Sequence, residues 1–319
     1  MKLAGVLVSV AACAAPNSPT QPVSPLPPDR PVPADANMDE SEATPPAAAI
    51  DPSKIVWPIY PVIGAVPTSH PTGDPITVPS PLVKVGDKHN RVIASTFEQH
   101  YFHDKTTRYQ LTKRDFDLDV KVLAVEHDHA SRIEVDANKA NESVALADAP
   151  TTTPRQNLSL LQGTYTVTAD SGRDGVKVTR GLGVEVYSRE IEELGGIFGN
   201  ELGAPDTTLV FLRSKRLRLG EVVALSDADK KTLGGDQLIG TFDLAVIAAD
   251  AKTVTYQMDV EATAPGLMSE KATIRMRATI AFERTSGRVL ALSRVTHKLD
   301  KASDAVDDTF ETESTTYTR

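Results

Sequence analysis

The feature that most constrains this chain is a regular alternation of apolar and polar residues from Leu82 to the C-terminus. Successive side chains of a strand point to opposite faces, so a period of two predicts half-buried β-strands. Glycine-containing turns at 171–175 and 285–288 have the composition of hairpin tips and predict antiparallel pairing. The clearest strands are expected at 91–97, 116–125, 131–136, 163–168, 241–249, 253–263, 273–283 and 289–298.

One segment departs from this alternation. Residues 184–202 place apolar side chains near helical spacing, which predicts a helix between two groups of strands. Its apolar residues are Val186, Ile191, Leu194, Ile197 and Phe198. A second, short turn of helix is expected to start at Ser226. The predicted fold class is therefore mainly β with a central helix, as an antiparallel half-barrel or curved sheet.

Three short motifs occur twice in the same order. Val85-Gly86-Asp87 is matched by Leu219-Gly220-Glu221, Phe116-Asp117-Leu118 by Phe242-Asp243-Leu244, and Ser171-Gly172-Arg173 by Ser286-Gly287-Arg288. The sequence predicts two similar β halves, 82–183 and 207–319, joined by a helix and linker at 184–206. The alternative is that antiparallel meanders reuse glycine turns and phenylalanine-led strands.

The N-terminus has the composition of a secretory signal. Lys2 is followed by an uncharged apolar run that is too short to span a bilayer, and small residues precede Cys13. The sequence predicts a signal peptide at 1–12, removal of that peptide, and lipidation of Cys13. Several acyl chains on this residue would form a stable membrane anchor. An ordinary secretory signal with an incidental Cys13 is the alternative.

The segment that follows is rich in proline, since 18 of the 22 prolines lie before Leu82. Such a composition buries too little surface to offset its ordering entropy, so 13–81 is predicted to be a disordered, lipid-anchored linker. Residues 55–66 differ because they contain the single tryptophan, Trp57. They are interpreted as a strap packed on the chain's own domain, with a docking segment for a partner as the alternative.

The small residues that end in Cys13, the low-complexity tether and the doubled motifs resemble those of uncharacterised bacterial lipoproteins. A more distant likeness is to the lipoprotein-localisation carriers LolA, LolB and LppX. It covers about residues 82–319 and implies a half-barrel closed by helices over a lipid-binding concavity. The resemblance implies no site residue. In such a half-barrel, a loosely packed helix would leave an apolar cavity, and Val186, Ile191, Leu194, Ile197 and Phe198 would be its lining. The alternative is that they simply fill the core.

Histidines and acidic residues cluster in two places. His100 and His103 lie close together, as do His127 and His129, and a turn could bring these candidate metal ligands near each other. Imidazole ligands would favour zinc or copper. The interpretation of 126–130 as a solvated hairpin tip is preferred. No cofactor is expected.

The remaining observations concern the class of function. A formal net charge of −9 and 5% aromatic residues argue against a nucleic-acid partner. No catalytic motif is recognisable, so the chain is expected to bind rather than catalyse. The leading hypothesis is an envelope lipoprotein that holds an apolar ligand or a lipidated partner in its concavity. The alternative is a structural or protein-interaction module. Ala14 after Cys13 favours the outer membrane if the envelope is double.

Overall fold

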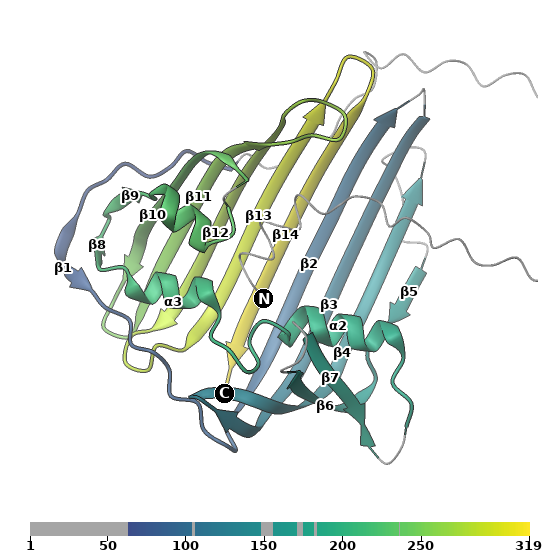
Figure 1. Cartoon of the computed structure of the whole chain (residues 1–319), viewed down its shortest axis with the longest axis vertical. Coiled ribbons are helices and arrows are strands. Elements are labelled where there is room, and N and C mark those ends of the chain that lie inside the picture. Colours follow the sequence, from purple (N-terminus) through teal and green to yellow (C-terminus); the bar gives the residue numbers. More distant parts are fainter. Residues whose placement is uncertain (1–62, 104–105, 148–155, 171–174, 182–183, 236) are drawn as a thin grey trace, which may run out of the picture.

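The structure is a computed structural model that describes residues 63–103, 106–147, 156–170, 175–181, 184–235 and 237–319. Its main feature is one curved, open sheet of 14 strands (Figure 1). The strand order is β1-β8-β10-β11-β12-β13-β14-β2-β3-β4-β6-β7, with β5 paired to β4 and β9 paired to β10. Except for β8 with β10, the pairs are antiparallel. The predicted fold class is confirmed.

The strands of the first half include the longest of the sheet. They are β1 Thr72–Ile76, β2 Lys88–His103, β3 Thr106–Glu126, β4 His129–Ala147, β5 Gln156–Ser159, β6 Gly163–Asp170 and β7 Gly175–Arg180. The second group is β8 Leu217–Leu219, β9 Val222–Ala224, β10 Ile239–Ala249, β11 Thr253–Ala264, β12 Ala272–Glu283, β13 Val289–Lys301 and β14 Val306–Thr318.

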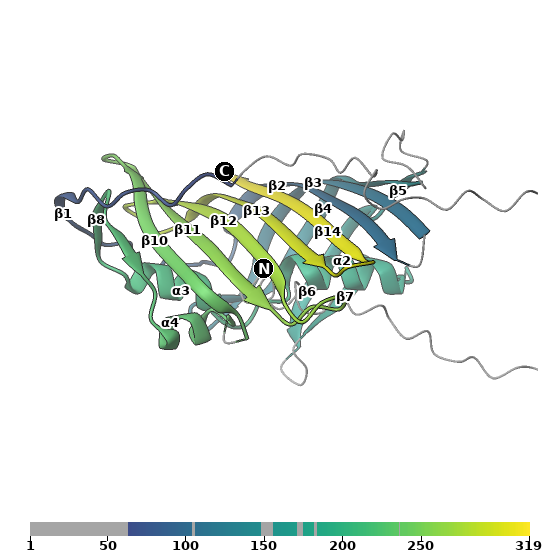
Figure 2. The same ribbon diagram turned by 90° about the horizontal axis from the view of Figure 1, so that it is seen from above.

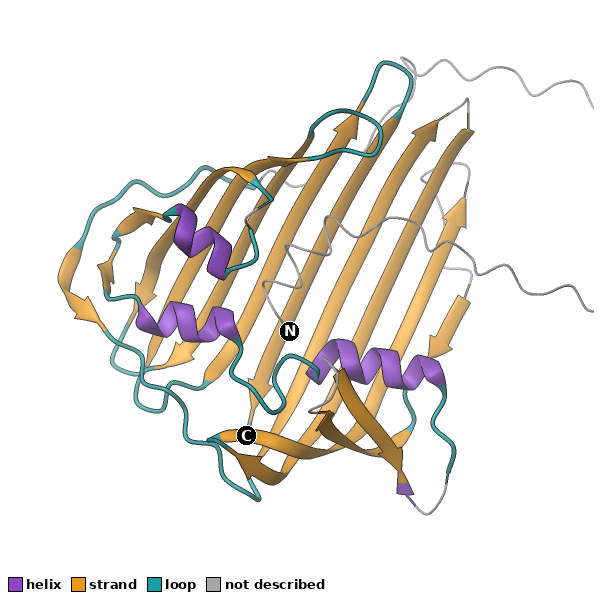
Figure 3. Ribbon diagram, in the orientation of Figure 1, coloured by secondary structure: helices purple, strands orange, loops and turns teal. Residues whose placement is uncertain are grey.

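Three described helices connect and cover these strands: α2 Ser188–Phe198, α3 Thr207–Ser214 and α4 Asp227–Thr232. They lie on the same side of the sheet, as Figures 2 and 3 show. We call this side the helix-side face and the opposite side the outer face. The β6–β7 hairpin also folds toward the helices (Figure 2).

The helix-side face carries two separate apolar cores. The first lies under α2, where Leu194 and Phe198 pack on Phe116, Leu118 and other side chains of β3, β4 and β6. The second lies under α3 and α4, which cover β10, β11 and β12. Alternate residues of β12 from Ile274 to Phe282 all belong to this core, which is the pattern that the period of two predicts.

Each helix begins at a polar contact. The Asp206 side chain accepts hydrogen bonds from the backbone N–H groups of Thr208 and Leu209 at the start of α3. The Ser226 hydroxyl accepts one from Asp229 at the start of α4, which confirms the short helix expected there. Such caps satisfy backbone donors that have no partner within the helix.

The two repeated turns have matching geometry. Gly86 and Gly220 both adopt positive φ, at 88° and 74°. The N–H of Gly86 donates to the carbonyl of Val122, and the N–H of Gly220 donates to that of Val246, each at 2.8 Å. The following acidic side chain accepts from the backbone two residues before the glycine, as Asp87 does from Lys84. These turns support the duplication, which stays a prediction.

Three elements differ from the expectations. The sheet begins at Thr72, inside the range 13–81 assigned to the linker, and Ile76 and Val78 belong to the second core. The helix expected over 184–202 is limited to Ser188–Phe198. The extra helix α3 was not expected. Residues 1–62, including the predicted signal peptide and Cys13, lie outside the described residues.

Candidate functional site

The middle of the helix-side face is polar, and it lies between the two apolar cores. Directly opposed residues of antiparallel strands share a face, so the register places polar side chains from β13, β14 and β2 on this side. None of α2, α3 and α4 lies over the upper part of these strands (Figure 3). We call this set the central strip: Arg91, Gln99, Arg294, Thr296, Lys298, Asp307, Thr309, Glu311, Glu313 and Thr315.

Charged groups of both signs are paired along the central strip. Arg294 Nη2 lies 3.1 Å from Glu313 Oε2 and 3.5 Å from Glu311 Oε2. Gln99 Nε2 donates to Asp307 Oδ1 at 2.7 Å. Burial raises the pKa of the Glu313 carboxyl, although the Arg294 guanidinium opposes the shift. The strip therefore offers donors and acceptors of both signs in a partly desolvated setting.

Some polar atoms of the strip have no partner. Arg294 Nε, Thr296 Oγ1 and Thr315 Oγ1 are buried without a hydrogen bond. Lys298 is also buried. A buried polar group without a partner costs about 1–3 kcal/mol, so native proteins leave few of them. The strip thus has unused hydrogen-bonding capacity.

A buried arginine closes the lower end of the strip. Arg91 is 1% exposed, and its Nη1 donates to both carboxylate oxygens of Glu201, at 3.0 and 3.1 Å. Its guanidinium lies between the rings of Phe198 and Tyr317, at 5.3 and 5.2 Å from their centroids. These contacts tie β2 and β14 to the loop that follows α2.

An ion network borders the strip beside α2. Arg114 on β3 pairs with Glu142 on β4 at 2.6 Å, and Arg189 on α2 pairs with the same carboxylate at 2.5 Å. Arg114 also lies 3.5 Å from Glu193. Burial raises the pKa of Glu193, while Arg114 acts in the opposite direction. The network connects α2 to the sheet through charges, in addition to the apolar contacts of the first core.

Apolar side chains lie next to the strip on the same face. The register places Phe97 and Tyr101 of β2 and Val144 and Leu146 of β4 on the helix-side face. Phe97, Tyr101 and Val144 are half-buried, while Leu146 is 53% exposed. We call these four residues the apolar border. The strip and the border together form an amphipathic surface.

The predicted ligand-binding residues lie on or beside α2. Leu194, Ile197 and Phe198 are buried in the first core, Val186 packs against it, and Ile191 is 38% exposed. Three of the five thus serve to fill the core. A ligand contact of any of them stays a prediction.

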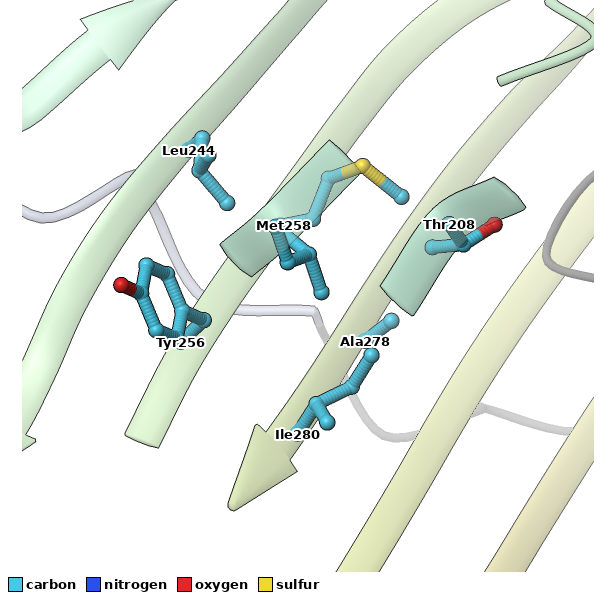
Figure 4. A pocket seen from close by; sticks show the side chains of 7 residues that line it. Thr208, Leu244, Tyr256, Met258, Ala278 and Ile280 are labelled. Atoms are coloured by element: carbon cyan, nitrogen blue, oxygen red, sulfur yellow. The ribbon is translucent and has the colours of Figure 1, made fainter. Parts of the chain in front are cut away.

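A small cavity lies under α3 in the second core. Figure 4 shows the side chains that line it, and its volume is about 10 Å³, which is about the space that one water molecule needs. The lining residues are Thr208, Leu212, Leu244, Tyr256, Met258, Ala278 and Ile280. An acyl chain does not fit in it, so this half of the sheet is packed by its own helices.

The four candidate metal ligands are not brought together. His100 and His103 lie near the end of β2, whereas His127 and His129 lie at the turn between β3 and β4. These positions are at opposite ends of β3, whose 21 residues span about 70 Å at ~3.3 Å each. Within the described ranges, no group of three or more potential ligands could hold a metal ion. His127 and Asp128 adopt positive φ, as a tight hairpin tip requires.

The described helices are also short or polar. In the part of the chain that the structure describes, none is long and apolar enough to cross a membrane.

Comparison with known proteins gives only distant likenesses. No family model matches the chain, and no curated protein matches it. Among solved structures, it is similar to lipovitellin, from a study of lipid–protein interactions, with 10% identity over 74% of this chain and a TM-score of 0.40. The chain spans about a quarter of that structure, at 25%. It is also similar to the translocator domain of the autotransporter NalP from Neisseria meningitidis, with 8% identity, 73% and 89% coverage and a TM-score of 0.19. At these TM-scores neither likeness bears on function.

Proposed function

We propose that this protein is a non-catalytic binding protein of the bacterial envelope, anchored by lipid on Cys13, and that it binds an amphipathic ligand on the helix-side face. The ligand is a lipid or the acylated part of a lipidated protein. The observation that carries the proposal is the central strip with its unpartnered buried atoms directly beside the apolar border.

The two parts of the surface fit the two parts of such a ligand. The polar group would take the hydrogen bonds that Arg294, Thr296 and Thr315 leave unmade. The apolar part would cover Leu146 and its neighbours, which gains about 25 cal/mol per Å² of apolar area removed from water. A purely apolar ligand would leave the polar groups of the strip without hydrogen bonds, because the charges of the strip would lose water without gaining partners.

The N-terminal composition supports the placement in the envelope. The short apolar run, Cys13 and the proline-rich stretch fit a signal, a lipid anchor and a tether that holds the sheet away from the membrane. Ala14 is consistent with the outer membrane in a double envelope.

A protein-interaction module is the second candidate, and the packed interior favours it. Both cores are filled by the protein's own helices, and the cavity under α3 holds at most about one water. In this case the same surface would hold a segment of another envelope protein without any lipid.

Native mass spectrometry with lipid extraction distinguishes the two candidates. The protein is purified from a bacterial envelope, and co-purifying lipid is expected. Leu146→Asp should abolish it because a carboxylate would be placed in the apolar border. Val92→Asp is the matched control, since Val92 is similarly exposed at 44% but lies on the outer face of β2.

The outcomes are separable. Lipid lost in Leu146→Asp and retained in Val92→Asp supports the proposal. A protein that carries no lipid overturns it in favour of the interaction module. Equal loss in both variants shows that the lipid is not held on the helix-side face, provided that both variants keep the far-UV circular dichroism of the unaltered sheet.

A further inference from the structure

A group of apolar side chains is buried on the face that carries no described helix. Phe102, Tyr109, Val306 and Phe310 are 2, 6, 9 and 6% exposed. Their register places them on the outer face of β14, β2 and β3, opposite the central strip. They belong to neither core, and no described helix covers them (Figure 2). We call these four residues the outer-face cluster, and their burial requires a covering segment.

The first described residues of the chain are held on this same face. Arg277 Nη2 on β12 donates to the carbonyls of Gly64 and Ala65, at 2.9 and 3.1 Å. Its Nε donates to Asp259 on β11 at 2.6 Å, and Gln257 donates to the other oxygen of that carboxylate. The guanidinium is therefore fixed by Asp259 and aimed at the backbone of residues 64 and 65.

The path of the chain after residue 65 indicates where residues 55–63 come from. The Ser69 hydroxyl accepts from the N–H of Val222, the N–H of His70 donates to the carbonyl of Gly220, and β1 then pairs with β8 at the edge of the sheet. The chain thus runs from β12 toward the β1 edge (Figure 1). The opposite direction, away from the β1 edge, leads across β13 to the outer-face cluster.

The preceding segment has the length and the chemistry to cover the cluster. Four strand spacings of ~4.8 Å, about 19 Å, separate β12 from β3. The nine residues 55–63 span up to about 30 Å when extended. Seven of them are apolar or aromatic, including Trp57 and Tyr60, and Pro58 and Pro61 disfavour a helix.

We propose that residues 55–63 form a strap that packs on the outer-face cluster, with Arg277 as its anchor. The strap lies on the face opposite the ligand surface, so it does not depend on the proposed function. It fixes the point at which the tether leaves the domain.

The test uses Trp57, which is the single tryptophan of the chain. In the full mature chain with Cys13→Ser, we expect blue-shifted emission and several-fold weaker quenching by acrylamide than in a peptide of residues 50–66. Arg277→Ala should move the quenching toward that of the peptide. Arg275→Ala is the matched control because Arg275 also lies on the outer face of β12 and pairs with Glu261, but has no contact with residues 64 and 65.

A second variant keeps the test independent of folding of the sheet. Ile59→Asp with Val62→Asp changes only the strap and should expose Trp57 while the circular dichroism of the sheet is unchanged. The proposal is overturned if Trp57 of the unaltered chain is quenched as readily as the peptide, or if this double variant leaves the shielding intact. An Arg277→Ala variant that behaves like Arg275→Ala would overturn the role of Arg277 as the anchor.

Discussion

At the scale of single residues, the polar groups of the helix-side face determine both stability and binding. Arg91 has an extensive set of contacts, since it is buried, paired with Glu201 and enclosed by two aromatic rings. Thr296, in the same strip, is the opposite case, because its hydroxyl is buried and has no hydrogen bond. Substitutions at these two positions are expected to have opposite effects on stability.

Removal of Arg91 should be strongly destabilising. Arg91→Leu removes a buried guanidinium from its ion pair with Glu201, and breaking a buried pair costs up to about 3–5 kcal/mol. Urea denaturation followed by circular dichroism measures the loss. Arg275→Ala breaks an exposed pair and should cost less than about 1 kcal/mol. Equal effects of the two substitutions would show that the burial of Arg91 is unimportant.

The same ion pair should give the protein a defined loss of stability in acid. Burial of Glu201 disfavours its charge, but the Arg91 guanidinium favours it, and the pKa of the carboxyl is lowered to about 2. The folded pKa is thus below the unfolded value of about 4.3. The contribution of the Glu201 carboxylate to the free energy of unfolding is fully present above the unfolded pKa and is lost as the pH falls toward about 2.

The variant Glu201→Gln isolates this contribution. The difference in unfolding free energy between the unaltered protein and the variant should be largest near neutral pH and should shrink as the pH is lowered toward 2. Denaturant titrations at several pH values measure it. A difference that does not change with pH would mean that Glu201 titrates alike in the folded and unfolded states.

Thr296→Val should stabilise the ligand-free protein by about 1 kcal/mol, because a buried hydroxyl without a partner is replaced by a methyl group. The same change should weaken ligand binding, because it removes a donor and acceptor from the strip. Thermal unfolding and native mass spectrometry measure the two effects. A loss of both stability and binding would show that the hydroxyl is already satisfied in the free protein.

At the scale of elements, the strands could be predicted well and the helices less well. The alternation in β11 and β12 is regular, and the eight predicted strands all lie within observed ones. The helix α3 could not be predicted because Thr207, Thr208, Val210 and Phe211 favour strands locally, and packing on β10 to β12 determines its structure. The strand β1 could not be predicted because the prolines in and around it are typical of a linker.

The candidate site was only partly predictable for a related reason. Arg294 and Glu313 pair across the turn between β13 and β14, whereas the hydrogen bond of Gln99 to Asp307 depends on the register between β14 and β2. That register joins residues about 200 positions apart, and no short motif signals it. The apolar residues of α2 could be recognised from their spacing, but spacing alone does not distinguish a core from a ligand cavity.

The packing of α2 gives a prediction at this scale. Leu194 is fully buried in the first core, so Leu194→Ala should cost about 2–5 kcal/mol. Glu192→Ala, on the exposed side of the same helix, should change stability by less than about 0.5 kcal/mol. Urea denaturation measures both. A small cost at Leu194 would indicate a loosely packed helix, which is what a lid over a ligand cavity requires.

At the scale of the whole molecule, the two halves share one hydrogen-bonded ladder. β14 and β2 pair from Val306 with Phe102 to Thr318 with Asn90, and each half brings its own core to this junction. The middle strands are therefore flanked by paired strands on both sides, whereas β1 and β7 stand at the ends of the order.

Amide hydrogen exchange should reflect this arrangement. Protection is expected to be highest in β14, β2 and β12 and to fall toward β1 and β7, because opening of the middle strands requires the loss of ladders on both sides. Exchange monitored by mass spectrometry tests this order. Fast exchange of β14 and β2 would mean that the halves separate easily and behave as two domains.

The placement of the short strands has a consequence for how these molecules behave at high concentration. An open sheet has two free edges, and a free edge is a template on which another chain can add a strand. In the strand order, the ends are occupied by β1 with five residues and β7 with six, while the strands of 12 to 21 residues are inside. A second molecule that docks edge to edge at β1 or β7 can form only a few hydrogen bonds. The short edge strands therefore protect this wide open sheet against polymerisation.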